Sequence, residues 1–118
     1  MTDFGRNLKL SIDLALRDAV RRFYEEGFGA SRRPLGDSMD QFTLADGFSL
    51  GVSYVSAAQA LPESAWEWAP WLEFRVDDVP GTTARLLGLG AVTVAFRDTT
   101  HPYLRGPGGP VFRLCSRV

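Results

Sequence analysis

The sequence of 118 residues predicts an α+β fold made of two βαβββ modules in tandem. Two observations lead to this prediction. A pattern of one strand, one helix and three strands runs through the first half of the chain and restarts in the second half. A shift of about 62 residues also superposes the first strands of the two halves. It lays Leu10, Ile12 and Leu14 over Leu72, Phe74 and Val76. Two unrelated halves would have to produce this agreement by chance, so we favour an internal repeat within a single domain.

The first module is expected over about residues 8–56. Apolar and polar residues alternate over residues 8–14, which predicts a strand with one buried face. Apolar residues at helical spacing follow from Leu16 to Phe23, and Gly27 is the expected C-cap. Three strands, at 28–35, 39–45 and 48–55, complete the module. The turns between them are predicted at Gly36-Asp37 and Asp46-Gly47.

A linker at about residues 57–70 breaks the pattern with two prolines and two tryptophans. The second module, about residues 71–118, begins with an alternating strand at 71–76. Asp78 then caps a predicted helix over 79–89, whose first turn tolerates Pro80 because that position lacks a helical hydrogen-bond partner. Strands at 91–96, 103–105 and 111–117 follow, with a tight turn at 106–110.

Charge and composition exclude several classes of function. The net charge of −1 and the isoelectric point near 5.7 predict no broad attraction to nucleic acid or to an anionic membrane. Cys115 is the only cysteine, which excludes an internal disulfide and fits a reducing compartment. The sequence lacks an apolar run of about 20 residues, the length of a membrane span, and its N-terminus lacks the apolar stretch of a signal peptide. We therefore expect a cytoplasmic protein.

Three stretches resemble a known superfamily. Residues 14–29 carry Phe23-Tyr24 before Gly27-Phe28-Gly29, residues 72–90 carry Val76-Asp77-Asp78-Val79, and residues 106–114 read Gly-Pro-Gly-Gly-Pro-Val-Phe-Arg-Leu. In this order they are similar to the vicinal oxygen chelate superfamily, which includes glyoxalase I, bleomycin-resistance proteins and extradiol dioxygenases. The resemblance implies curved mixed sheets around a cavity, helices on the outer face, and a homodimer.

The metal enzymes of this superfamily place His or Glu ligands on four strands. Position by position, the resemblance puts no such ligand within residues 8–10 or 49–55, and it puts Trp71 and Arg113 at the other two positions. A divalent cation needs several nitrogen or oxygen donors converging on it. We therefore predict a cavity with no metal, no cofactor and no catalytic residues inherited from the family, closest to the metal-free bleomycin-resistance type.

Strand alternation selects the residues expected to line this cavity. If Leu72, Phe74 and Val76 pack under the helix, their neighbours face the cavity. These neighbours are Trp71, Glu73 and Arg75, with Arg113 and Cys115 from the last strand and Lys9, Ser11 and Asp13 from the first. An indole, carboxylates and cations suit a polar ligand that contains a ring.

The aromatic candidates have two interpretations each. Trp66, Trp68 and Trp71 either form a stacking wall for a planar ligand or fill the junction between modules or a dimer seam. Tyr54 is a further candidate for ligand contact, with core or sheet surface as the alternative. His101 precedes a proline and reads as a solvated loop residue rather than a general base. Cys115 reads as a small buried residue rather than a nucleophile.

The leading hypothesis is a homodimeric, metal-independent binding protein that sequesters an antibiotic or another polar aromatic compound. Trp71 stacks on the ligand, Glu73 and Asp13 meet its cationic groups, and Arg113 meets an anionic or carbonyl group. One alternative is an enzyme acting on a small carbonyl or aromatic substrate: a lyase or isomerase with Glu73 or Asp13 as base, a dioxygenase, or a metal enzyme with displaced ligands. A second alternative is a structural or regulatory dimer whose cavity is filled.

Overall fold

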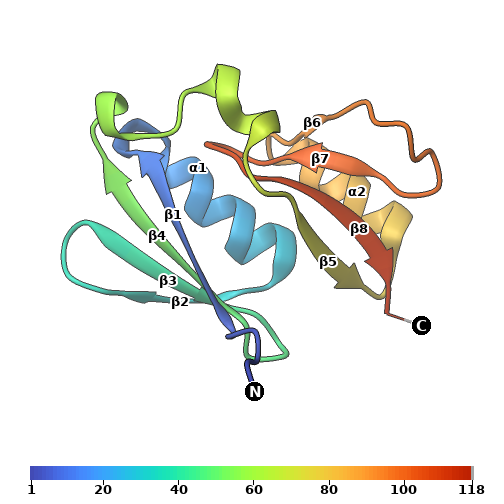
Figure 1. Cartoon of the computed structure of the whole chain (residues 1–118), viewed down its shortest axis with the longest axis horizontal. Helices are drawn as coiled ribbons and strands as arrows, with labels where there is room; N and C mark the ends of the chain where they lie inside the picture. The colour runs from blue at the N-terminus through green and yellow to red at the C-terminus, as the bar shows by residue number, and fades with distance from the viewer. Residues whose placement is uncertain (118) are drawn as a thin grey trace.

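The computed structural model describes residues 1–117. Its first module is a four-stranded sheet covered by one helical segment (Figure 1). Its strands are β1 (Asn7–Asp13), β2 (Ser31–Pro34), β3 (Met39–Thr43) and β4 (Ser49–Val55). The helical segment runs through a 3₁₀ turn (Leu14–Leu16), α1 (Arg17–Arg22) and a π turn (Phe23–Gly27). The strand order is β1-β4-β3-β2, with β1 parallel to β4 and the other pairs antiparallel.

The second module repeats this arrangement. It contains β5 (Leu72–Val76), α2 (Val79–Gly88), β6 (Val92–Thr93), β7 (Tyr103–Arg105) and β8 (Val111–Ser116). The strand order is β5-β8-β7-β6, again with the first and last strands parallel. The predicted tandem of two βαβββ modules is confirmed. The last residue assigned to the second module, Val118, lies outside the described residues.

The turns follow the expected chemistry. The Asp78 side chain accepts a hydrogen bond from Gly81 N at 3.1 Å and so caps α2, with Pro80 in the first turn. Gly47 adopts a φ of 89° in the β3–β4 hairpin. Between the modules, two 3₁₀ turns form within the predicted linker, at Ala57–Gln59 and Glu63–Trp68.

Two predicted strands are shorter than expected. The predicted strand 28–35 begins only at Ser31, because Phe28 stays in a helical conformation and Gly29 then turns the chain with a φ of 68°. The predicted strand 91–96 is reduced to Val92–Thr93, because the chain then leaves the sheet. The loop of residues 95–102 folds over the sheet instead and carries Asp98, whose hydrogen bonds are described below.

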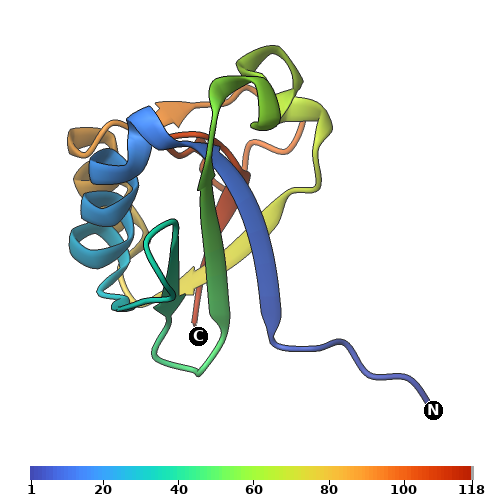
Figure 2. The same ribbon diagram turned by 90° about the vertical axis from the view of Figure 1, so that its left-hand side faces the viewer.

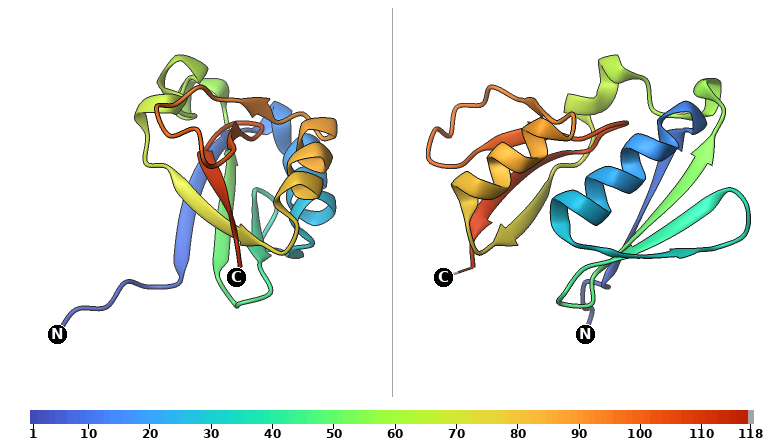
Figure 3. Two further views of the ribbon diagram at one scale, coloured as in Figure 1. Left: turned by 90° about the vertical axis from the view of Figure 1, so that its right-hand side faces the viewer. Right: turned by 180° about the vertical axis from the view of Figure 1, so that it is seen from behind.

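Both helical segments lie on the same side of the two sheets (Figure 2), and from behind they run side by side across the molecule (Figure 3). They bury a core shared by both modules. Phe28 of the first module stacks on Phe74 of β5 with ring centroids 4.3 Å apart, and Phe23 lies 6.1 Å from Phe112 of β8. The helices therefore cover the outer face, as predicted, and aromatic contacts at this face join the modules. Within residues 1–117, every helix is too short or too polar to cross a membrane.

Candidate functional site

The open face of the second sheet, the face of β5, β7 and β8 that points away from α2, carries a set of polar side chains. Phe74, Phe112 and Leu114 are buried in the core, so their neighbours along each strand point to the opposite side. The neighbours are Glu73 and Arg75 on β5 and Arg113 and Cys115 on β8. Alternation in the sequence therefore predicts this face correctly.

Glu73 and Arg113 form an ion pair on this face because the parallel register of β5 and β8 places them opposite each other. Arg113 Nε donates to Glu73 Oε1 at 2.7 Å, and Cys115 Sγ donates to the same oxygen at 3.2 Å. These hydrogen bonds, the one from Cys115 and the one from Arg113, hold the pKa of Glu73 below its ordinary value. Burial, followed by the bond to Glu73, raises the pKa of the Cys115 thiol. The thiol therefore stays protonated and acts as a donor to Glu73 rather than as a nucleophile.

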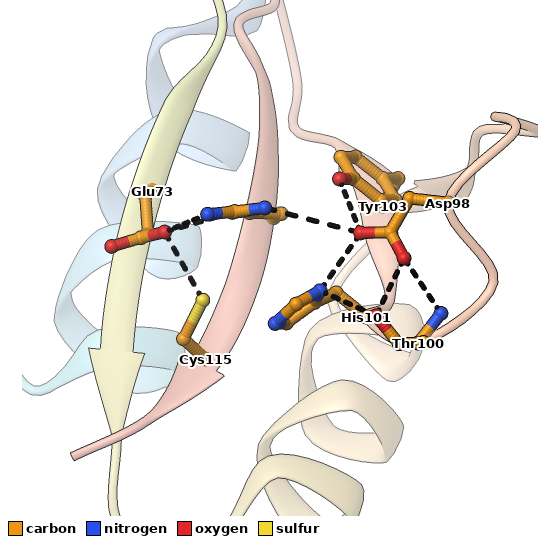
Figure 4. Close-up of polar contacts among 7 residues, drawn as sticks. Glu73, Asp98, Thr100, His101, Tyr103 and Cys115 are labelled. Atoms are coloured by element: carbon orange, nitrogen blue, oxygen red, sulfur yellow. Dashed lines mark hydrogen bonds and ion pairs between the residues drawn. The ribbon is translucent and has the colours of Figure 1, made fainter.

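Asp98, in the loop that covers the face, extends this cluster (Figure 4). Its Oδ2 accepts a hydrogen bond from Tyr103 OH at 2.8 Å, lies 2.8 Å from His101 Nδ1, and is 3.9 Å from Arg113 Nη1. Its Oδ1 accepts from the backbone N–H of Thr100 at 2.8 Å and from the Thr100 hydroxyl. The bonds from Thr100, followed by those from His101 and Tyr103, strongly lower the pKa of Asp98. Asp98 is therefore a carboxylate held between the loop and the sheet.

Asp98 and Tyr103 were not among the predicted site residues. The signal in the sequence is the Asp98-Thr99-Thr100-His101 run, because an aspartate two residues before a threonine commonly accepts hydrogen bonds from that residue. His101, which the sequence suggests is a solvated loop residue, is half-buried and contacts Asp98.

Trp71 packs beside the cluster, against the loop. Its ring lies 4.9 Å from that of Phe96 in an edge arrangement and 5.7 Å from that of Tyr103. Its Nε1 donates to the backbone carbonyl of Glu67 at 3.0 Å. Trp71 is half-buried, and its indole packs against the protein's own aromatic side chains.

The other predicted site residues lie elsewhere. Tyr54 is buried on the helix side of the first sheet, because it points to the same face of β4 as the core residues Leu50 and Val52. Its hydroxyl donates to Asp40 at 2.7 Å. Asp13 caps the first 3₁₀ turn by accepting from Ala15 N at 2.9 Å. Trp66 packs under the Arg105 guanidinium, 5.1 Å from its ring centroid, whereas Trp68 is 89% exposed.

A cleft of about 840 Å³ is lined by residues of both modules. Its apolar wall combines residues of both modules: Phe28, Leu44, Phe48, Leu50, Leu72, Phe74 and Val76. Its charged lining consists of Asp46, Glu73, Arg75, Asp77, Asp78, Arg85 and Arg117. Glu73 and Arg75 therefore belong both to the open face and to this cleft. The other predicted site residues, which all belong to the described part of the chain, do not line the cleft.

The residues do not fit the metal site that the superfamily resemblance implies. Among residues 1–117, no group of three or more His, Cys, Asp and Glu side chains is placed to hold a metal ion. The donor chemistry explains why: the Arg113 guanidinium lies between Glu73 and Asp98, and a fixed positive charge already satisfies these two carboxylates. A metal ion bound by both carboxylates would need the position that the Arg113 guanidinium occupies.

Comparisons with known proteins agree with the fold. The sequence matches the family model described as a glyoxalase-like domain over residues 9–115. No curated protein matches the sequence significantly. Among solved structures, a possible glyoxalase from Bacillus cereus is similar at 20% identity, with a TM-score of 0.68, and the match covers 96% of this chain and 98% of that one.

Fosfomycin resistance proteins are also similar in structure. FosX from Mesorhizobium loti is 17% identical, with a TM-score of 0.72, over 100% of this chain and 94% of that chain. FosX from Listeria monocytogenes is 15% identical, also with a TM-score of 0.72, over 100% and 96%. At these identities the similarity concerns the fold.

Proposed function

Because this chain belongs to the glyoxalase-like domain family of the vicinal oxygen chelate superfamily, we propose that it is a metal-independent binding protein for a small aromatic molecule with a positively charged group. The observation that carries the proposal is the position of Glu73. This carboxylate lines the cleft between the modules, beside its apolar wall, and is held in place by Arg113 at 2.7 Å. Because Glu73 is held in one orientation, it can select a ligand by charge while the apolar wall of the cleft supplies affinity.

The size and lining of the cleft support a ligand of this kind. About 840 Å³ is within the range of sites that enclose drug-sized molecules, roughly 300–1,000 Å³. Leu72 and Phe74, whose side chains alternate with that of Glu73 along β5, line the apolar wall of the same cleft, where the ring of a ligand can pack. Among the described residues, the hydrogen bonds from Arg113 and Cys115 both end on Glu73 Oε1, which leaves Oε2 for a donor on the ligand.

The other charges of the cleft are largely engaged within the protein. Arg85 Nε donates to the Gly27 carbonyl at 3.1 Å, Arg117 lies 3.5 Å from Asp77, and Asp78 caps α2. Asp46 lies 3.3 Å from Arg6, so Glu73, whose Oε2 remains for a donor on the ligand, is the carboxylate that we expect to meet it.

Binding to chelator-treated protein tests the proposal. Benzamidine, a planar aromatic cation, and a panel of antibiotics that includes bleomycin and fosfomycin are titrated into ¹⁵N-labelled protein. We expect a cationic aromatic compound to shift the amide signals of Leu72–Val76. Glu73→Gln keeps the size of the side chain and removes its charge, so it is expected to weaken this binding about tenfold or more, since a hydrogen bond to a charged group contributes roughly 1.5–3 kcal/mol.

Glu67→Gln is the matched control, because Glu67 is exposed on the linker and does not line the cleft. It should bind the same compound as tightly as the unmodified protein. Binding that appears only when a divalent metal is added back, or equal binding by Glu73→Gln, would contradict the proposal.

A further inference from the structure

We infer that Tyr103 and Arg113 form a subsite for an anionic group of the ligand, and that the Asp98 carboxylate fills this subsite when the ligand is absent. This inference rests on the proposed function, because Arg113 holds Glu73 with one edge of its guanidinium and reaches Asp98 with the other. Figure 4 shows Asp98 Oδ2 meeting the donors of the sheet at the edge of the open face.

The donors are fixed while the acceptor is carried by a loop. Tyr103 and Arg113 are directly opposite each other in the antiparallel pair of β7 and β8, and Tyr103 is buried. Asp98 instead belongs to residues 95–102, outside the regular strands. Its distance to Arg113 Nη1 is 3.9 Å, against 2.7 Å between Arg113 and Glu73. The contact between Asp98 and Arg113 is therefore the one a ligand can replace most easily.

The two oxygens of Asp98 divide its contacts. Oδ1 accepts the bonds of Thr100 that shape the loop, whereas Oδ2 accepts from Tyr103 and faces His101 and Arg113. The backbone turn at Thr100 is therefore held by Oδ1, whereas the contact of Oδ2 within the loop is with the His101 side chain. Moving Oδ2 away leaves a phenol hydroxyl and a guanidinium side by side.

These two donors define the chemistry of the ligand. A phenol O–H and a guanidinium N–H both donate to the oxygens of a carboxylate or a similar oxyanion. Trp71 and Phe96 lie against Tyr103, and Phe96 is 41% exposed, so an aromatic ring attached to the anion has a surface to rest on. Together with Glu73, the subsite points to an aromatic ligand that carries both a positive and a negative group.

Sodium benzoate and its neutral analogue benzamide test this subsite, with binding followed by calorimetry and by the indole N–H signal of Trp71. Asp98→Asn keeps an oxygen for the Thr100 bonds and replaces the competing carboxylate with an amide. We expect this variant to bind benzoate at least tenfold more tightly than the unmodified protein and to bind benzamide equally. Asp37→Asn, which removes the same charge at the exposed β2–β3 turn, should leave benzoate binding unchanged.

Unchanged benzoate affinity in Asp98→Asn, or an equal gain for benzamide, would overturn the inference. Tyr103→Phe removes one donor and should weaken benzoate binding to the unmodified protein severalfold. If Asp98→Asn does not fold, this variant decides, and equal affinity rejects the subsite. Benzamidine, titrated in parallel, tests Glu73 separately: benzoate binding without benzamidine binding would reject the cleft proposal while keeping the subsite.

Discussion

Asp40 is the most deeply buried charge of the first module, and its contacts connect four elements of that module. Its carboxylate, on β3, accepts from Arg21 Nε at 2.8 Å and from Tyr54 OH at 2.7 Å, and Arg32 Nη1 lies 3.5 Å away. The side chain is completely buried, whereas both arginines remain partly exposed. The cluster ties α1, β2 and β4 to β3 on the helix side of the sheet.

Replacing Asp40 with alanine should strongly destabilise the protein, because it leaves Arg21 and Tyr54 without this acceptor, whereas Arg32 keeps its bond to Glu25. Removal of one partner of a buried pair costs about 3–5 kcal/mol, and the partial exposure of the arginines favours the lower end. Urea unfolding at neutral pH measures the change. Asp37→Ala, at an exposed turn, should change the free energy of unfolding little; a comparable loss in both variants would show that Asp40 has no special role.

The same cluster predicts acid sensitivity. Burial by itself raises the pKa of Asp40, but the hydrogen bonds from Arg21 and Tyr54 and the nearby positive charges outweigh it and bring the pKa below its ordinary value of 3.8. A folded-state pKa below the unfolded one contributes stability above about pH 4, and this contribution is lost as the pH falls further. The urea midpoint of the unmodified protein should therefore fall more steeply on acidification than that of Asp40→Ala.

At the scale of elements, the turn between β7 and β8 locks the second module onto the first. Gly108 has a φ of 77°, and a Cβ at this position would collide with Ile12 of β1, which is 1% exposed. A Cβ on Gly106 would lie 3.1 Å from the ring of Phe23. The glycines of this turn are therefore required for close contact between modules as well as for the turn itself.

Gly108→Ala and Gly36→Ala separate these two requirements. Both glycines have a positive φ, but a Cβ on Gly36 meets open space. The left-handed conformation should cost each variant roughly 1–2 kcal/mol, and overpacking against Ile12 should cost Gly108→Ala about 1–3 kcal/mol more. Equal thermal stability of the two variants would show that the contact with Ile12 is easily relieved.

Sequence patterns predicted the strands and faces but only part of the site. The alternation on β5 and β8 correctly placed Glu73, Arg75 and Arg113 on one face, because strand geometry is local. The same rule, applied to β4, would have placed Tyr54 with the core residues Leu50 and Val52. The position of Asp98 could not be predicted, because its contacts with Tyr103 and Arg113 depend on how residues 95–102 fold back over the sheet. The cleft is equally non-local, since its walls come from both modules.

At the scale of the whole molecule, the modules share one hydrophobic core. The buried cluster contains Val20 and Tyr24 of the first module together with Leu86 and Leu114 of the second. Modules of this length are marginal on their own, since small domains bury a lower fraction of their surface. The common core is therefore the main source of stability for each of them.

The shared core predicts a single cooperative unfolding transition. All three tryptophans lie at residues 66–71, so their fluorescence reports on the linker and the start of the second module. Circular dichroism in the far ultraviolet reports on both modules. The two signals should change at the same urea concentration. Separate midpoints would show that the modules unfold independently.

The identical strand order of the two sheets has a consequence for how such a chain can change over evolution. Each half provides its own version of the same scaffold, yet the buried charge cluster around Asp40 belongs to one copy and the open cluster around Arg113 to the other. When each repeated unit is stabilised by packing against the other, the side chains on its outward surface are less needed for the stability of the fold. Mutations on that surface then alter the chemistry of one copy while the other preserves the shape.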